Sequence, residues 1–205
     1  MSAFIVIEGL DGAGTTTQLT RLQDALQQAG ATTMATREPT AGPIGRIIRQ
    51  TLGGEDSAPS VNSLPWMFAA DRSDHLERTV EPALARGEYV VSDRYVPSSL
   101  AYQSLTLPLE DVFALNARFR VPDLLIFVRV PVDVCMERIG GRDQKREIYE
   151  QTDALTAVSN AYDAVLHRLG RRGDPIVEVD GTQSMDAVQQ AILAQVQEAG
   201  LWPSS

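Results

Sequence analysis

Residues 9–18 form a glycine-rich segment, Gly-Leu-Asp-Gly-Ala-Gly-Thr-Thr-Thr-Gln, between an apolar run and an amphipathic stretch. The apolar run at residues 4–7 is typical of a buried strand, and the leucine spacing from residue 17 to residue 29 predicts a helix. A strand that turns through glycines into a helix directs several backbone N–H groups at one point, where they bind phosphate without a side-chain charge. The segment therefore predicts a nucleotide-binding P-loop.

One position of this loop departs from the usual pattern, G-x-x-x-x-G-K-[ST]. Gly9, Gly14 and Thr16 fit the pattern, but Thr15 occupies the lysine position. Lys145 is the only lysine in the chain, so no other lysine can replace the missing one. The sequence leaves open whether Thr15 is natural or an introduced substitution. The candidate phosphate-binding residues of the loop are Gly9, Asp11, Gly12, Ala13, Gly14, Thr15, Thr16 and Thr17.

The composition limits the classes of protein to which the chain can belong. Its 205 residues, 43% of them hydrophobic, suit one α/β domain with a sizeable core. A net charge of −9 argues against a nucleic-acid surface, which needs clustered cations. No apolar run is long enough for a membrane span and no basic leader precedes the first strand, so we expect a cytoplasmic protein. The lone cysteine, Cys135, excludes an internal disulfide and is expected in the core.

Apolar runs alternate with amphipathic stretches along the whole chain. This alternation is typical of a parallel sheet with helices on both faces. We predict strands at residues 3–7, 32–36, 89–92, 124–130 and 176–179. We predict helices at 16–29, 43–52, 64–86, 109–118, 132–139, 149–170 and 184–199, of which Pro82 should interrupt or kink the third. The predicted fold is a three-layer α/β/α arrangement around a five-stranded parallel sheet, in a single domain over residues 1–205.

Chemically functional residues follow the predicted strands, beyond whose carboxyl ends such sheets bind ligands. Asp93 ends the third strand, where its carboxylate and the hydroxyl of Thr16 are candidate magnesium ligands. The alternatives are a helix cap for Asp93 and a turn hydrogen bond for Thr16. Arg37, Arg72 and Arg94 lie at or near the same edge. Guanidinium groups grip phosphate oxygens, although a single arginine would more often form a surface ion pair.

Three further groups of residues are candidates for binding. Phe68 and Arg72 are four residues apart on one helix face, which suits stacking on a base and bonding its edge, although Phe68 alone would more often be a core residue. The Asp11 carboxylate could accept a hydrogen bond from a sugar hydroxyl or from a magnesium-bound water. The alternative is that it bonds the loop backbone. A cationic segment around the glycine pair at 140–141 favours a mobile lid over ATP phosphates, at about residues 138–149, over a solvated turn. Its cations are Arg138, Arg142, Lys145 and Arg146. His75 and His167 are isolated and expected to be structural or surface residues.

Together these residues resemble the thymidylate kinase (dTMP kinase) family of P-loop nucleoside monophosphate kinases. The resemblance rests on FIVIEGLDGAGTTTQ at residues 4–18, TREP at 36–39, FAADR at 68–72, DRYVPSSLAYQ at 93–103, YE at 149–150 and DGT at 180–182. It covers nearly the whole chain. The DRY…AYQ stretch with FAADR upstream is specific to this family among its relatives, whereas the P-loop alone is not.

The resemblance implies a reaction and a set of partners. The γ-phosphoryl group of MgATP is transferred to the 5′-phosphate of dTMP, giving dTDP and ADP, so ATP and Mg²⁺ are the implied cofactors. Family members commonly form homodimers through helices beside the acceptor site. In the acceptor site, the resemblance places Phe68 on the thymine, Arg72 at the base edge, Ser99 against the pyrimidine and Tyr102 beneath the sugar, where it disfavours a 2′-hydroxyl.

The same resemblance implies roles around the phosphates. Arg37 and Arg94 hold the acceptor phosphate, and Asp11 meets the 3′-hydroxyl or a metal-bound water. Asp93 serves the magnesium site. Glu38 and Ser98 belong to the motifs that bind the substrate. Arg138 approaches the ATP, and Gly181 and Thr182 lie near its adenine.

Thr15 is the departure from the family, in which a lysine contacts the transferring phosphates. Removing one such donor typically lowers the rate ~100- to 1,000-fold. We expect Arg142, Lys145 or Arg146 of the lid to take over this contact on closure. One alternative is a catalytically weak nucleotide-binding protein, and another is a kinase for a different nucleotide or nucleoside. The nearly complete acceptor-site pattern favours a working dTMP kinase over both.

Overall fold

The computed structural model describes residues 2–55, 57–140 and 145–203, with side chains in the last range from residue 152 onward. At its centre lies a five-stranded parallel sheet in the order β2-β3-β1-β4-β5. The strands are β1 (Phe4–Gly9), β2 (Thr33–Arg37), β3 (Tyr89–Asp93), β4 (Leu124–Arg129) and β5 (Ile176–Asp180). The predicted fold class is confirmed, and every predicted strand is present with its ends shifted by at most two residues.

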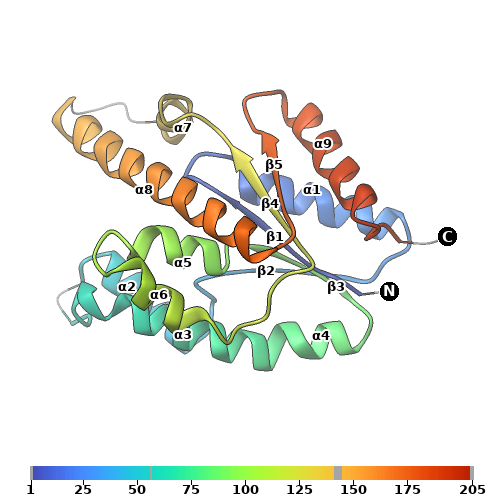
Figure 1. Ribbon diagram of the computed structural model, residues 1–205, viewed down its shortest axis with the longest axis horizontal. Helices are drawn as coiled ribbons and strands as arrows, with labels where there is room; N and C mark the ends of the chain where they lie inside the picture. The colour runs from blue at the N-terminus through green and yellow to red at the C-terminus, as the bar shows by residue number, and fades with distance from the viewer. Residues whose placement is uncertain (1, 56, 141–144, 204–205) are drawn as a thin grey trace.

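Helices cover both faces of this sheet (Figure 1). On one face, α1 (Thr15–Gln28) packs against α9 (Met185–Glu198). The opposite face carries α4 (Glu81–Ala85), α5 (Val96–Gln103) and α8 (Lys145–Arg172). The other helices are α2 (Pro43–Leu52), α3 (Leu64–His75), α6 (Leu109–Asn116) and α7 (Val132–Ile139), with a 3-10 turn at Val61–Ser63. Within the described ranges, no helix has the length and apolar character that crossing a membrane requires.

Helices α5 and α8 differ from the prediction, whereas the break between α3 and α4 agrees with it. Helix α5 was not predicted, because Pro97 and the serines beside it break the apolar spacing. Its proline lies in the first turn, where the N–H that proline lacks has no helical partner anyway. Helix α8 begins at Lys145, so residues 145–148 belong to a helix and not to a loop. A π-helical turn at Leu76–Val80 separates α3 from α4 directly before Pro82, which confirms the expected interruption.

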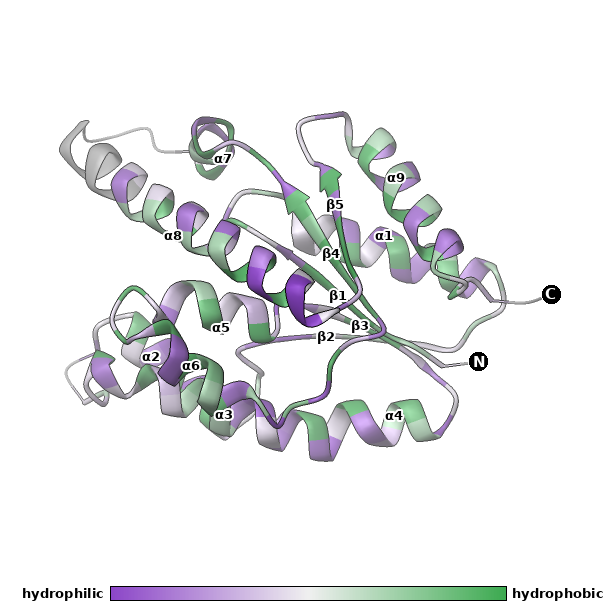
Figure 2. Ribbon diagram, viewed as in Figure 1, coloured by the Kyte–Doolittle hydropathy of each residue, from purple (hydrophilic) through white to green (hydrophobic). Residues whose placement is uncertain are grey.

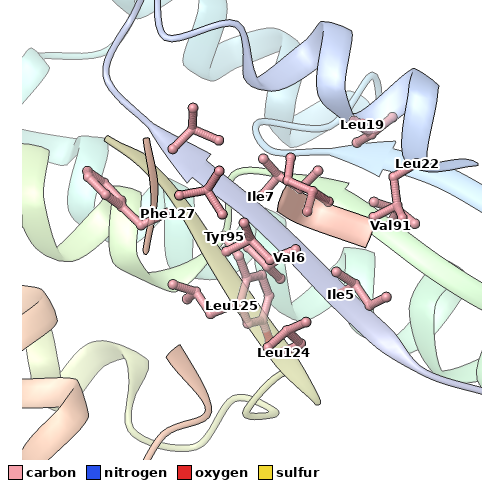
Figure 3. Packing of buried hydrophobic residues seen from close by; sticks show 14 of the residues in the cluster. Ile5, Val6, Ile7, Leu19, Leu22, Val91, Tyr95, Leu124, Leu125 and Phe127 are labelled. Carbon is pink, nitrogen blue, oxygen red and sulfur yellow. The ribbon is translucent and has the colours of Figure 1, made fainter. Parts of the chain in front are cut away.

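The core lies on both faces of β1, all of whose residues are buried. Figure 2 shows a mostly hydrophobic β4 inside the sheet, a more polar β2 at its edge, and flanking helices of mixed character. Leu19 and Leu22 of α1 lie on the side of Ile7 (Figure 3). Phe4 packs edge to face on Tyr95, with ring centroids 5.1 Å apart. Burying each such side chain contributes about 1.5–3 kcal/mol. This packing on both faces fixes the position of β1.

The strand register brings the functional segments to one edge. Ile7 of β1 pairs with Asp93 of β3, and Asp93 in turn pairs with Arg37 of β2. Gly9, where the P-loop begins, pairs with Val128 of β4. The ends of the strands thus place Arg37, Asp93 and the P-loop together, as expected for the ligand-binding edge of a parallel sheet.

Two glycine substitutions test the packing that supports this edge. A Cβ at Gly45 in α2 would lie 1.9 Å from the carbonyl oxygen of Thr40, in the segment that follows β2. We expect Gly45→Ala to lower the free energy of unfolding by about 1–3 kcal/mol or more. In α8, a Cβ at Gly170 would meet no described atom within 4 Å, so Gly170→Ala should raise the free energy of unfolding by up to about 1 kcal/mol. Urea unfolding measures this free energy for both variants. A change in the same direction in the two variants would contradict this account.

Candidate active site

The P-loop connects β1 to α1 and opens into a cleft of about 650 Å³. Gly12 and Gly14 have φ angles of 85° and 89°, which L side chains rarely adopt. A Cβ at Gly12 would also lie 2.6 Å from the carbonyl oxygen of Cys135, so the loop packs closely on α7. The predicted loop residues that line the cleft are Asp11, Gly12, Gly14, Thr15, Thr16 and Thr17. Gly9 and Ala13 form the buried base of the loop instead.

Thr15 is buried although it borders this cleft. Its methyl group Cγ2 would lie 3.1 Å from a Cβ added to Gly9, so the side chain packs against the start of the loop. It brings no charge to the cleft. At this position the positive potential therefore comes from the amides of the α1 N-terminus.

Thr16 and Asp93 meet at the mouth of the loop. The Thr16 hydroxyl donates a hydrogen bond of 2.5 Å to Oδ2 of Asp93. The other carboxylate oxygen of Asp93 is buried and has no partner in the described part of the chain. Magnesium prefers oxygen ligands of this kind, so the pair fits the ion. The alternative of a helix cap for Asp93 is wrong, because the cap position of α5 is Tyr95 and no N–H of this helix donates to Asp93.

Four arginines border the phosphate cleft: Arg37, Arg49, Arg94 and Arg138. Arg37 is exposed, and Nη1 of Arg49 donates to the carbonyl oxygen of Pro39 at 3.0 Å. Sequence reasoning misses Arg49, because an arginine on an amphipathic helix resembles a surface residue. The signal that identifies it is the start of α2 directly after the segment that contains Arg37 and Pro39.

Arg94 has a left-handed backbone, with φ 71°. Its Nη2 donates to Oδ1 of Asp11 at 2.7 Å, and its Nη1 donates to the hydroxyls of Ser98 and Tyr162 at 3.0 and 3.3 Å. Burial alone would lower the pKa of Arg94, but the acidic groups around it outweigh burial and raise it. The guanidinium is therefore charged at any working pH and points into a polar cluster.

A second pocket, of about 410 Å³, adjoins the cleft and is lined mainly by apolar surface. The predicted substrate residues in its wall are Asp11, Glu38, Phe68, Arg72, Arg94, Ser98, Ser99 and Tyr102. Phe68 is half-buried in this wall. Burial raises the pKa of Tyr102 to about 12, so its hydroxyl stays protonated and donates to Oδ2 of Asp11 at 3.1 Å. Arg37 is the one predicted acceptor-site residue that borders the cleft and not this pocket.

Arg72 is held rigidly at the inner end of this pocket. Its Nη2 donates to Oε2 of Glu38 at 2.6 Å and to the hydroxyl of Ser99 at 2.9 Å, while Nη1 donates to Oδ1 of Asn116. The guanidinium also lies 5.1 Å from the ring centroid of Tyr95. Both members of the Arg72–Glu38 pair are almost completely buried, so each charge depends on the other.

Two further residues complete this inner end. His75 is buried, with Nδ1 3.0 Å from Oε1 of Glu38 and Nε2 2.7 Å from the hydroxyl of Thr36, so it is not isolated, contrary to expectation, but belongs to this cluster. Gln103 lines the pocket, and its Oε1 is buried and without a partner in the part of the chain that the structure describes. Sequence reasoning misses Gln103 as a site residue because α5 itself was not predicted.

The opposite end of the phosphate cleft contains Arg138 at the end of α7. Its Nη2 donates to the carbonyl oxygen of Gly181 at 3.0 Å, which brings together two of the predicted ATP-binding residues. Thr182 is exposed beside them. Arg142 lies outside the described residues, and the side chains of Lys145 and Arg146 are also outside them, so the lid remains a prediction.

The two cavities share one wall. Asp11, Glu38, Pro39 and Arg94 border both the phosphate cleft and the pocket, as does Leu52. A group bound in the pocket and a group bound at the P-loop would therefore meet at Asp11 and Arg94. This arrangement suits two ligands that exchange a phosphoryl group, since such transfer depends on positioning and on neutralised charge.

Similarity to known proteins agrees with this geometry. The model of the family described as Thymidylate kinase matches residues 7–192. The chain is 38% identical over 200 residues to the "Thymidylate kinase" of Alkalilimnicola ehrlichii, across 92% of this chain and 89% of that protein. It is 32% identical over 196 residues to the "Thymidylate kinase" of Desulfotalea psychrophila, across 95% of this chain and 94% of that protein. The chain therefore belongs to the thymidylate kinase family of nucleoside monophosphate kinases.

Proposed function

We propose that this chain transfers the γ-phosphoryl group of MgATP to the 5′-phosphate of dTMP and releases dTDP and ADP. The observation that carries the proposal is the wall that the phosphate cleft and the acceptor pocket share at Asp11 and Arg94. An acceptor phosphate at this wall lies within reach of Arg94, with Arg37 and Arg49 on the cleft side. The three guanidinium groups hold and neutralise the acceptor.

The pocket suits a thymine base. Phe68 offers an aromatic face for stacking, while Arg72 and Gln103 each keep one buried polar atom, Nε and Oε1, without a partner among the described residues. Thymine presents a carbonyl acceptor beside an N–H donor, which would satisfy both atoms. Cytosine presents the reverse order and would leave both unsatisfied, which costs about 1–3 kcal/mol per buried group. Tyr102 beside Asp11 is suited to the sugar and favours a deoxyribose.

The donor side holds ATP through the P-loop amides, with Arg138, Gly181 and Thr182 toward its adenine. Thr16 and Asp93 would hold a magnesium ion, which would supply positive charge to the phosphates. The uncharged Thr15 is compensated by a lid cation, Arg142, Lys145 or Arg146. Closure of a lid also excludes water, which favours transfer over hydrolysis.

We further propose a cytoplasmic homodimer. Ile47 on α2 and Trp66 on α3 are 40% and 54% exposed, although both are large apolar side chains. The two helices contact each other beside the acceptor pocket, so these residues offer a surface for a second copy. The buried, reduced Cys135 is consistent with a reducing compartment.

One observation favours a second candidate, a nucleotide-binding protein with little turnover. Thr15 adds no charge where phosphoryl transfer usually has a lysine. Such a protein would bind ATP and dTMP but form no product. It would have little reason to keep the Thr16–Asp93 magnesium pair together with the base-binding and phosphate-binding groups, so the working enzyme is the better account.

A panel of acceptors tests the proposed function. We expect rapid MgATP-dependent ADP release with dTMP, weaker release with dUMP, which lacks only the 5-methyl group, and little with dCMP, AMP or thymidine. Thymidine fails because it offers no phosphate to the arginines. A preference for another acceptor would show that dTMP is not the substrate. Binding of dTMP without ADP release would establish the second candidate.

A second prediction concerns the charge missing at residue 15. If a lid cation supplies it, Arg142→Ala, Lys145→Ala or Arg146→Ala should lower turnover ~100-fold or more, the typical effect of losing one such donor. Thr15→Lys should restore turnover in the impaired variant, because it returns a cation to the loop. Arg78→Ala is the matched control, since the Arg78 side chain is 76% exposed and lies away from both cavities. Lid variants that all stay within a few-fold of wild type would contradict the compensation.

A further inference from the structure

Glu8 is a fully buried carboxylate that none of the roles above uses. It is the next-to-last residue of β1, directly before the P-loop. Its Oε1 accepts from the backbone N–H groups of Tyr95 and Ser98 at 2.8 and 3.2 Å. Its Oε2 accepts from the hydroxyls of Ser98 and Tyr162 at 2.7 and 2.9 Å. The four donors come from segments about 90 and 150 residues away along the chain, so the fold assembles the site around this carboxylate.

The first oxygen fixes the start of α5. The N–H groups of Tyr95 and Ser98 belong to the first turn of this helix, which has no side-chain cap of its own. A carboxylate at this end also interacts favourably with the helix dipole. Arg94 immediately precedes the turn and is the single non-glycine residue with positive φ in the described ranges. Such a backbone costs about 1–3 kcal/mol and persists only where neighbours enforce it. Glu8 is one such neighbour.

The second oxygen orients the acceptors of Arg94. Ser98 and Tyr162 each carry one hydroxyl proton, and their oxygens lie 2.8 Å apart. Because Glu8 accepts from this pair, the two protons lie toward Glu8 or between the two hydroxyls, and both oxygens keep a lone pair for Nη1 of Arg94 at 3.0 and 3.3 Å. The carboxylate thus determines, through two intermediaries, where this guanidinium is held.

The charges around Glu8 agree with this reading. Burial raises the pKa of Glu8, while the Arg94 charge and the hydrogen bonds from Ser98, Tyr95 and Tyr162 oppose the shift. Tyr162 of α8 is itself buried and its pKa is raised, so it stays a hydroxyl donor. On the far side of Arg94, Asp11 of the P-loop and Tyr102 of α5 form the rest of the cluster.

We propose that Glu8 is a positioning residue, which holds the Arg94 guanidinium in the orientation that grips the acceptor phosphate. The inference rests on the proposed function, in which Arg94 binds the phosphate of dTMP. Because Glu8 belongs to β1, the strand that leads into the P-loop also sets the position of Arg94. The acceptor phosphate and the P-loop are therefore both positioned by one rigid strand.

Glu8→Gln is the decisive variant, because it keeps the size of the side chain but replaces one hydrogen-bond acceptor, a carboxylate oxygen, with a donor, the amide nitrogen. The amide oxygen still accepts from Tyr95 and Ser98, but the amide nitrogen now donates to the two hydroxyls. Their protons must turn away, and at least one then opposes Nη1 of Arg94. We expect the dTMP dissociation constant and its KM to rise at least about tenfold, the usual effect of losing a hydrogen bond to a charged group, with the KM for ATP unchanged.

Two tyrosine variants serve as a matched pair. Tyr162→Phe removes one intermediary and should weaken dTMP binding in the same direction as Glu8→Gln. Tyr89 is also buried and begins β3, at the end of the strand away from Arg94, and its hydroxyl has no hydrogen-bond partner in the described residues. Tyr89→Phe should therefore change neither the dissociation constant nor the KM for dTMP. Equal effects of the two tyrosine variants would overturn the proposal.

A double-mutant cycle tests whether Glu8 acts through Arg94. In the Arg94→Ala background, Glu8→Gln should have no further effect on dTMP affinity. Additive effects would overturn the proposal. Calorimetry reads dTMP binding without turnover. A wild type that fails to bind dTMP would overturn the proposed function itself, whereas normal binding in Glu8→Gln would overturn this inference alone.

The pH dependence separates positioning from mere support of the fold. The pKa of Glu8 in the folded protein is raised above its ordinary value of 4.5. As pH rises from 4.5 through this raised pKa, the wild-type protein loses stability, whereas the Glu8→Gln variant loses none from this position. Over the same window wild-type Glu8 ionises and its advantage in dTMP affinity grows. Relative to wild type, the variant should therefore gain stability and lose affinity as pH rises. Stability and affinity that change together would indicate a structural role and overturn the proposal.

Discussion

Two buried carboxylates at the carboxyl edge of the sheet determine how the site is built. Glu8 lies at the end of β1 and Glu38 directly after β2, and each is tied to an arginine of the acceptor side. Removing such charges from water costs several kcal/mol per ion unless geometry and hydrogen bonds are complete. The two carboxylates meet this condition, since every one of their oxygens has a partner, whereas Nε of Arg72 has none among the described residues. The result is that Arg72 and Arg94 are oriented before any ligand binds.

This preassembly supports the proposal that the site works with an uncharged residue 15. In phosphoryl transfer the protein contributes position and charge, and little covalent chemistry. Position comes from the P-loop amides and from the Arg94 guanidinium, which Asp11, Ser98 and Tyr162 hold in place. Charge alone is left to be supplied, which is why our proposal assigns it to a mobile cation. The proposal thus combines a rigid acceptor side with a mobile source of charge on the donor side.

Local sequence signals were enough for the sheet but not for all of the site. The five strands, the P-loop and the break before Pro82 follow from apolar runs, glycine spacing and the missing proline N–H. Helix α5 was missed because its first turn is stabilised by Glu8, a residue far away in the sequence. Gln103 was missed with it. The clustering of Arg72 with Glu38 and Asn116 likewise depends on tertiary contacts that no spacing rule predicts.

The central claim is that the preassembled arginines direct the phosphoryl group to a nucleotide and not to water. Phosphorus NMR of wild-type protein with MgATP and dTMP measures this directly, because it resolves dTDP, ADP and inorganic phosphate in one sample. The account predicts that dTDP and ADP appear in equal amounts, with inorganic phosphate at background. Accumulation of inorganic phosphate while dTMP stays unchanged, or bound nucleotides that never react, would contradict it.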